Sequence, residues 1–230
     1  MCGRFSLTAT AADLREFLDA GEIPELAPRY NIAPSQPVLI VRLRDGQPAR
    51  EVTHAAWGLI PPWAPDPSIG SRLINARADT AAVKPAFRNA MKRRRCLIPA
   101  DGYYEWAAQP GRPKQPYLIR RRDGAPFAFA GLWEIWHGPN GEQIESCTIL
   151  TTEPNGLVKS IHNRMPVVLP REAHAAWLDT AAHPPDRVQP LLQPCDAGEW
   201  EMVAISRRVN SPTHDDASCW EPERSEDLFG

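Results

Sequence analysis

Proline restricts the fold of this chain more than any other residue type. The sequence holds 25 prolines among 230 residues, more than twice the average share of about 5%. Each proline fixes φ and removes the N–H that a helix interior or a central strand needs. Proline-rich stretches such as 21–37 and 58–65 are therefore expected to be irregular loops. Helices must be short, and strands must fit between the prolines.

Short apolar runs between the prolines predict a structure made mostly of strands. Asp45-Gly46 indicates a hairpin, and Asp123-Gly124 and Asn140-Gly141 indicate further turns. The expected strands are 38–43, 51–57, 96–99, 117–121, 127–135, 144–151, 167–169 and 202–206, and the expected helices are 11–18 after Thr10, 79 or 80 to about 93, 171–178 and 187–192. Helices that are not regularly interleaved with strands are typical of α+β folds. We expect a single domain with antiparallel, barrel-like β-sheets and a few short peripheral helices.

Charge is distributed unevenly along the chain. The net charge of −2 does not by itself indicate a nucleic-acid partner. Residues 213–230 hold six acidic residues and one arginine, so residues 1–212 carry a net positive charge. We expect residues 1–212 to form the folded domain and residues 213–230 to form an acidic, loosely ordered tail.

The cysteines and the hydropathy pattern indicate a reducing compartment. The five cysteines are odd in number and never form a C-x-x-C pair, which argues against a disulfide framework and against a zinc site. We expect no metal and no other cofactor. The sequence contains no run of about 18 apolar residues that could span a membrane and no signal peptide. A cytoplasmic location follows, on the nucleoid if the organism is bacterial, and it keeps Cys2 a thiol.

Cys2 offers the most unusual chemistry in the chain. Once Met1 is removed, Cys2 carries an α-amine with a pKa of about 7.7–8.0 beside a thiol with a pKa of about 8.5. Such a 1,2-aminothiol captures an aldehyde twice, because the amine forms a Schiff base and the thiol then closes a five-membered thiazolidine ring. Gly3 leaves room for a bulky aldehyde. The alternative is that Cys2 is an ordinary small buried cysteine.

Three polar residues are candidates for proton transfer and orientation. Glu105 lies within the aromatic run 103–106, and apolar surroundings raise the pKa of a carboxyl toward neutral pH, as general acid–base catalysis requires. His162 could shuttle a proton, and Asn75 could orient a sugar hydroxyl or the N-terminal amine. The alternatives are a surface glutamate, a hydrogen-bonded structural histidine and an asparagine that closes a turn.

Three arginines and one tryptophan are candidates for binding a nucleic acid. Arg4, Arg77 and Arg164 could clamp phosphates with their planar forks. Trp63, on its proline-stiffened loop, could stack on a base. Each arginine could equally form a surface ion pair of little energetic worth, and Trp63 could pack among the prolines.

Eight motifs in this sequence resemble those of the SRAP family, the SOS-response-associated peptidase-like proteins. They are Met1-Cys2-Gly3-Arg4-Phe5, Arg29-Tyr30-Asn31-Ile32-Ala33-Pro34, Trp57-Gly58-Leu59-Ile60-Pro61, Ile74-Asn75-Ala76-Arg77, Cys96-Leu97-Ile98-Pro99-Ala100-Asp101-Gly102, Tyr104-Glu105-Trp106, Gly131-Leu132-Trp133-Glu134 and Ile161-His162-Asn163-Arg164-Met165-Pro166. The resemblance extends over residues 1–212, and residues 211–215 match the Asn-Pro-rich segment of the family only loosely.

The resemblance implies a sensor of abasic sites in single-stranded DNA. Such a protein cross-links through its N-terminal cysteine to the aldehyde of the ring-opened deoxyribose. Carried over by motif, the resemblance makes Cys2 the nucleophile and Glu105 the proton-transfer residue. It makes His162 an aid to ring opening and Asn75 the group that orients the reactants.

The same resemblance implies how the DNA is held. The residues expected at the flanking phosphates are Arg4, Asn31, Arg77, Thr151 and Arg164, and Trp63 is expected to stack beside the lesion. Met1 is expected to be removed, and either the protein itself or a methionine aminopeptidase could remove it. We expect the protein to act as a monomer.

Three functions remain open at this point: covalent capture of abasic DNA, a cysteine peptidase that pairs Cys2 with His162, and a non-covalent binder of single strands or modified bases. Acetylation of the α-amine would abolish only the first, and binding that disappears in denaturing gels and falls with salt would indicate the third. Covalent capture is favoured because it alone explains why a processed Cys2 accompanies arginines and an acid–base glutamate.

Overall fold

Strands dominate the fold. The computed structural model describes residues 2–44 and 49–223. Its strands are β1 (Phe5–Leu7), β2 (Arg29–Ile32), β3 (Pro37–Leu43), β4 (Arg50–Trp57), β5 (Asn75–Arg77), β6 (Arg95–Ala100), β7 (Gly102–Gln109), β8 (Arg112–Arg121), β9 (Phe127–His137), β10 (Gln143–Thr152), β11 (Met165–Pro166), β12 (Val168–Leu169) and β13 (Trp200–Ala204). Within the described residues these strands form two sheets, and the expected α+β class with barrel-like sheets is confirmed.

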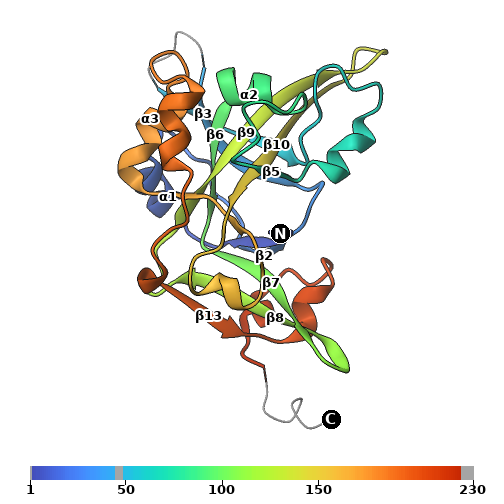
Figure 1. The fold of residues 1–230 in the computed structure, drawn as a ribbon, viewed down its shortest axis with the longest axis vertical. Coiled ribbons are helices and arrows are strands. Elements are labelled where there is room, and N and C mark those ends of the chain that lie inside the picture. The colour runs from blue at the N-terminus through green and yellow to red at the C-terminus, as the bar shows by residue number, and fades with distance from the viewer. Residues whose placement is uncertain (1, 45–48, 224–230) are drawn as a thin grey trace.

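Five strands of the larger sheet close into a barrel, which fills the upper half of Figure 1. Their order is β10-β4-β3-β6-β9, and β9 pairs again with β10. All these pairings are antiparallel except the short parallel one between β4 and β10. β5 continues along β10 beyond the end of β4, also in parallel, with Ile149 opposite Asn75 and Thr151 opposite Arg77. Because β9 pairs with β10, the first and last of these five strands are joined and neither is left as an open sheet edge on that side.

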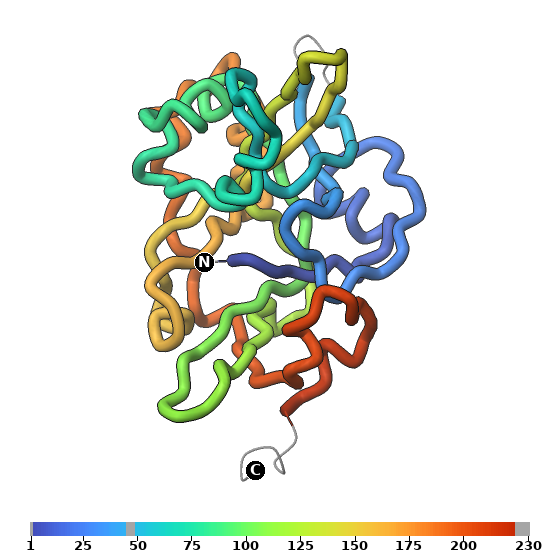
Figure 2. Tube along the Cα trace, turned by 90° about the vertical axis from the view of Figure 1, so that its right-hand side faces the viewer, coloured from blue at the N-terminus to red at the C-terminus, as the bar shows by residue number. Residues whose placement is uncertain are grey.

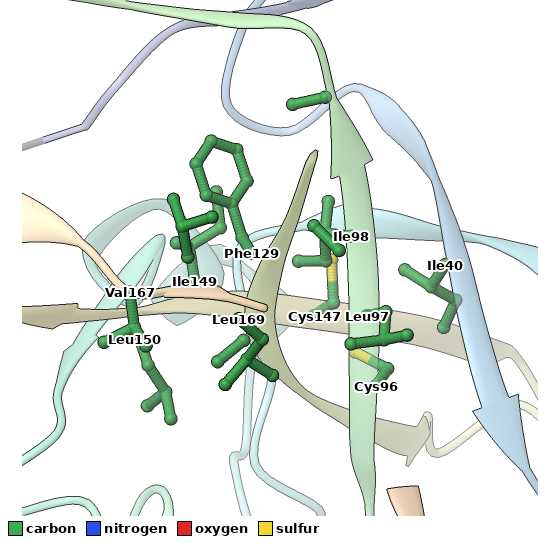
Figure 3. Packing of buried hydrophobic residues seen from close by; sticks show 14 of the residues in the cluster. Ile40, Cys96, Leu97, Ile98, Phe129, Cys147, Ile149, Leu150, Val167 and Leu169 are labelled. Atoms are coloured by element: carbon green, nitrogen blue, oxygen red, sulfur yellow. The ribbon is translucent and has the colours of Figure 1, made fainter. Parts of the chain in front are cut away.

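The barrel interior is the main hydrophobic core. Figure 3 shows side chains of β3, β6, β9 and β10 packed together there, among them Ile40, Ile98, Phe129 and Ile149. Gly131 on β9 permits the close approach of β6, because a Cβ at that position would lie 2.8 Å from the Cys96 sulfur and 2.9 Å from Cδ1 of Ile98. Interiors packed to this density tolerate little change in volume, so the barrel is a rigid support for its rim.

The smaller sheet has the order β13-β8-β7-β1-β2 and is antiparallel throughout. β1 lies inside it, with Phe5 opposite both Tyr103 of β7 and Ile32 of β2. Phe5 also packs edge-on against Trp57 and Phe129 of the barrel, at 5.1 and 5.7 Å between ring centroids. The start of the chain therefore lies where the two sheets meet, in the middle of the molecule (Figures 1 and 2).

The helices are short and peripheral, as the prolines require. They are α1 (Ala11–Leu18), α2 (Arg88–Arg93), α3 (His174–Leu178) and α4 (Pro185–Val188), with short 3₁₀ segments at Pro67–Arg72, Val158–Ser160, Arg171–Ala173, Gln189–Leu191, Ala197–Glu199, Arg207–Asn210 and Ala217–Trp220. α1 begins with the expected Thr10 cap, which exchanges hydrogen bonds with Asp13 in a capping box. The helix expected from residue 79 or 80 is wrong, because α2 begins only at Arg88. Pro85 lacks the N–H that a longer helix would need.

The acidic C-terminal segment is more ordered than its composition predicts. Asp215 accepts hydrogen bonds from the backbone N–H groups of Tyr30 and Asn31, at 2.6 and 2.8 Å, and pairs with Arg29. Trp220 donates to the Tyr104 hydroxyl at 2.8 Å. Residues 213–223 are therefore packed on β2 and β7 and are not a loose tail. Residues 224–230 and the expected Asp45-Gly46 turn lie outside the described residues.

Candidate functional site

Cys2 lies just ahead of β1, at the junction of the two sheets. Its side chain is fully buried, and its sulfur lies 3.8 Å from the Arg4 carbonyl oxygen. The Asn75 side-chain amide donates a 2.7 Å hydrogen bond to the Cys2 carbonyl oxygen. Asn75 reaches this position because β5 runs beside β10 at the barrel rim. The Asn75 Oδ1 atom is buried and has no hydrogen-bond partner within residues 2–44 and 49–223, so an acceptor is available beside Cys2.

Glu105 is brought next to Cys2 by the pairing of β1 with β7. Phe5 lies opposite Tyr103, and the Tyr104 N–H donates to the Arg4 carbonyl at 3.0 Å, so Glu105 follows beside the residues that precede β1. Glu105 is 3% exposed. Burial raises the pKa of its carboxyl to about 7, so both protonation states are populated near neutral pH. Burial and the neighbouring Glu105 carboxylate raise the pKa of the Cys2 thiol, which therefore stays protonated.

His162 lies in the loop that leads into β11. Its Nδ1 is 3.0 Å from the Arg164 backbone nitrogen and 3.1 Å from the Arg164 carbonyl oxygen. These contacts fix the orientation of the ring. Burial lowers the pKa of His162, so the imidazole is uncharged at neutral pH and offers one nitrogen as donor and the other as acceptor.

Arg77, Thr151 and Arg164 lie side by side on three adjoining segments. Thr151 of β10 pairs with Arg77 of β5 on one side and with Pro166 of β11 on the other. Arg164 Nη2 donates to the Thr151 carbonyl at 2.5 Å and lies 3.3 Å from its hydroxyl. An open hollow of about 640 Å³ is lined by Arg77, Glu153, Pro154, Lys159, Ser160, Ile161, His162, Asn163 and Arg164. The predicted phosphate-binding residues Arg77, of β5, and Arg164, just before β11, therefore share one hollow with His162.

Arg4 and Asn31 form a separate pair on the β1–β2 side. Arg4 Nη1 donates to the Asn31 side-chain oxygen at 2.7 Å and to the Val209 carbonyl at 2.8 Å. The Asn31 side chain is fully buried, and its Nδ2 donates to the carbonyl oxygens of Val209, Ser211 and His214. Asn31 is thus placed to hold Arg4 and the C-terminal segment rather than to face solvent.

Trp63 stands on the proline-rich loop that follows β4, as expected, and is 57% exposed. No other aromatic ring or cation of the described chain packs on its ring. The loop is shaped by Gly58, whose φ is +140° and where a Cβ would lie 2.6 Å from the Gly70 carbonyl oxygen. The structure does not join Trp63 by hydrogen bonds or ring contacts to the other candidate residues.

Two lysines escaped the sequence interpretation. Lys114 of β8 is exposed, and its positive charge lowers the pKa of both Glu105 and His162, after the larger effect of burial on each. Lys159 lines the hollow beside His162. Lys159 could have been identified from the sequence, because it lies two residues before the Ile161-His162 motif. Nothing in the sequence distinguishes Lys114 from an ordinary surface lysine. A larger hollow of about 690 Å³, near Phe17 and Trp200, contains none of the candidate residues.

Comparison with known proteins identifies the family. The model of the SOS response associated peptidase (SRAP) family matches residues 1–212. The chain belongs to the SRAP family. Among its relatives, the abasic site processing protein YoaM of Bacillus subtilis is 43% identical over 97% of this chain and 99% of its own length. The abasic site processing protein YedK of Escherichia coli is 31% identical over 96% of this chain and 100% of its own length.

Vertebrate and structural relatives extend this result. The abasic site processing protein HMCES of Gallus gallus is 32% identical over 96% of this chain and 78% of its own length. A crystal structure of a Bacteroides thetaiotaomicron protein superimposes with a TM-score of 0.85 at 28% identity, covering 97% of this chain and all of that one. The fold shared with this structure therefore spans nearly the whole chain, including residues that the sequence pattern assigned to a tail.

Proposed function

We propose that this SRAP protein captures abasic sites in single-stranded DNA as a covalent thiazolidine on Cys2, after removal of Met1. The observation that carries the proposal is the burial of Cys2 beside Glu105, whose pKa is raised to about 7, with Asn75 bonded to the Cys2 backbone. The names of the relatives, which are abasic site processing proteins, support the same substrate.

The chemistry proceeds in two additions to one carbon. The α-amine of the processed Cys2 attacks the C1′ aldehyde of the ring-opened sugar and gives a carbinolamine. Loss of water, helped by a proton from Glu105, leaves a Schiff base. The Cys2 sulfur then adds to the same carbon while its proton passes to Glu105 and the electron pair of the C=N bond returns to nitrogen, which is protonated in turn. One aldehyde and one aminothiol thus give one thiazolidine and one water.

The pKa shifts of Cys2, Glu105 and His162 give each of these residues a role in this proposal. Because the thiol is protonated at neutral pH, it needs a base, and the ionised fraction of Glu105 supplies one. The uncharged imidazole of His162 assists opening of the closed sugar. Asn75 fixes the Cys2 backbone through one side-chain atom and keeps the other available to the reactants.

The DNA backbone is held on both sides of Cys2 in this proposal. Arg77 and Arg164 contact phosphates in the hollow beside His162, and Thr151 holds Arg164 in place. Arg4 contacts a phosphate on the opposite side, held by Asn31. The exposed ring of Trp63 stacks on a base beside the lesion.

A cysteine peptidase that pairs Cys2 with His162 is less well supported. Such an enzyme needs a thiolate, which neighbouring positive charge or an adjacent base stabilises. Here burial and Glu105 raise the pKa of the thiol instead. A thiol kept protonated suits addition to an imine that an amine has already prepared.

The test is a denaturing gel. Purified protein mixed with a single-stranded oligonucleotide that carries one abasic site should give a band that survives heat and detergent, and an undamaged strand should give none. Acetylating the α-amine while sparing the thiol should abolish the band, and intact mass should show that the active chain has lost one methionine. A stable band from acetylated protein, or from protein that keeps Met1 on every molecule, would refute the proposal.

A further inference from the structure

Arg77 is already paired with a carboxylate of the protein itself, in the hollow where we expect it to bind a DNA phosphate. Its Nε donates to Asp79 Oδ1 at 3.1 Å and its Nη2 donates to Asp79 Oδ2 at 2.6 Å. These two parallel bonds have the fork geometry with which arginine also binds phosphate. Both side chains remain open to solvent, at 59% exposure for Arg77 and 52% for Asp79. The carboxylate therefore occupies the donors that a DNA phosphate would use.

Arg164 in the same hollow is arranged differently. Its guanidinium is held by the carbonyl and hydroxyl of Thr151, and within the described residues no carboxylate lies at ion-pairing distance from it. The Arg164 guanidinium is thus held by neutral acceptors, and the Asp79 and Glu153 carboxylates act on it only electrostatically, without a direct ion pair among the described residues. The bond between Arg77 and Asp79 is not needed to build such a site, since the neighbouring arginine is positioned without one.

We propose that Asp79 is an internal competitor of DNA phosphate at Arg77 and, by this competition, a specificity-determining residue that weakens retention of undamaged single strands. This inference rests on the proposed function. A damaged strand is retained by its covalent bond to Cys2 and does not depend on Arg77 once the bond has formed. An undamaged strand has only its phosphate contacts, so it is released more readily.

A DNA phosphate can compete with Asp79 for Arg77 because the ion pair between the two side chains is exposed to solvent. Ion pairs between solvent-exposed side chains contribute little, so a phosphate can displace Asp79 and the carboxylate can turn into water. The exchange replaces one anion on Arg77 with another, and few counterions are released. With an uncharged residue at position 79, binding of the phosphate would add a new ion pair and release counterions from the strand.

The chain contains a matched control for this arrangement. Arg121 and Asp123 have the same spacing, with Nε to Oδ1 at 3.0 Å and Nη2 to Oδ2 at 2.6 Å. This second pair stands at the end of β8, beside the hollow near Trp200 that contains no candidate DNA-binding residue. Arg121 also contacts Glu199 at 3.1 Å, but Asp123→Asn removes the same charge from a pair of the same geometry without touching the hollow of Arg77.

The experiment measures binding of the full chain to a fluorescent oligothymidine without a lesion, by anisotropy at several salt concentrations. Asp79→Asn should bind about three- to tenfold more tightly at low salt, the effect of one unit charge a few ångströms from a phosphate in water. The salt dependence of its affinity should steepen by up to about 0.7, the single-strand value for one phosphate. Asp123→Asn should change binding less than about twofold, as a distant screened charge does.

A second measurement tests specificity directly. Cross-linking of an abasic strand is followed in the presence of excess undamaged oligothymidine, which should slow Asp79→Asn more than the native chain. Equal or weaker binding by Asp79→Asn would overturn the inference and make Asp79 a support for Arg77, and an equal gain in Asp123→Asn would reduce the effect to net charge. Undamaged strands bound as expected without any cross-linking would instead refute the proposed function alone. A native chain that binds no single strands would refute both.

Discussion

The residues proposed for chemistry and those proposed for DNA binding lie in contrasting environments. Cys2 and Glu105 are 0% and 3% exposed, and burial raises the pKa of both. Arg77 and Arg164 line an open hollow. Desolvation controls proton transfer in the first region, whereas screening by salt controls attraction in the second. The contrast teaches that capture and binding can be separated: changes in the first region should alter the rate at saturating protein, and changes in the second should alter affinity.

The largest effect is expected from Cys2→Ala, which removes the thiol and should abolish the heat-stable adduct. Cys2→Ser keeps an α-amine, so its Schiff base should persist only after borohydride trapping. The matched control is Cys147→Ala, which also replaces a fully buried cysteine. The measurement is adduct yield on denaturing gels, with circular dichroism to confirm the fold. An undiminished stable adduct from Cys2→Ala would show that the buried region does not carry the chemistry.

Glu105→Gln should slow single-turnover cross-linking by about 10²–10⁴-fold at saturating protein, the usual contribution of general acid–base catalysis. Binding to undamaged strands should hardly change. Glu134→Gln is the control, because Glu134 is also buried and has a pKa raised by burial, but it is paired with Arg94 at 2.5 Å in the barrel. If both variants slow cross-linking equally, the loss of a buried carboxyl explains the lower rate, and the position of Glu105 beside Cys2 does not.

The pH dependence of the native rate should identify the same groups. Above pH 7 the protonated fraction of Glu105, whose pKa is about 7, falls tenfold per pH unit, and the rate should fall with it once the α-amine is fully free. On the acid side the protonated α-amine, with a pKa of about 7.7–8.0 in model compounds, limits the rate. Glu105→Gln should lose the alkaline limb and keep the acid limb. A native rate that stays constant from pH 8.5 to 10 would exclude Glu105 as the acid.

Arg164→Ala should have the smallest effect on chemistry and act through binding. Losing one phosphate contact should weaken binding about tenfold at low salt, the ratio that corresponds to 1.4 kcal/mol, and lower the salt slope by about 0.7. Cross-linking should recover at saturating protein. Arg122→Ala, on the exposed segment after β8, is the control and should behave like the native chain. A saturated rate that stays low in Arg164→Ala would mean that the two regions are not separable, because the variant keeps the Arg164 backbone N–H that contacts His162 and loses only the guanidinium.

Local signals predicted the elements of the fold well, and long-range pairings were beyond them. The capping residue Thr10 predicted α1, and the structure adds Asp13 to the cap. Apolar runs predicted the barrel strands. Closure of the barrel by β9 and β10 and the parallel pairing of β5 with β10 depend on contacts between distant segments, which no local pattern encodes. The acidic segment was misjudged because composition does not reveal that Asp215 caps the backbone of β2.

The sequence predicted those features of the candidate site that depend on residues close together in the chain. The aminothiol was inferred from position 2 alone and stays a prediction, whereas the raised pKa of Glu105 was expected from its aromatic neighbours and agrees in direction with the structure. The bond from Asn75 to the Cys2 carbonyl spans 73 residues and depends on strand register at the barrel rim. A surface ion pair was one of the alternatives for Arg77, but its partner Asp79 and its place in a hollow shared with Arg164 required the fold.

The interior position of β1 has a consequence for protein synthesis. β1 leaves the ribosome well before β7, its partner strand, and Arg4 closes its contact with Val209 only when most of the chain exists. At roughly 5–20 residues per second, the start of the chain waits on the order of ten seconds or more for these partners. Cys2 is fully buried once β1 is docked, so a methionine aminopeptidase would find the start of the chain accessible only during that interval. The order of synthesis therefore leaves the start of the chain accessible until the last partner of β1 has been made.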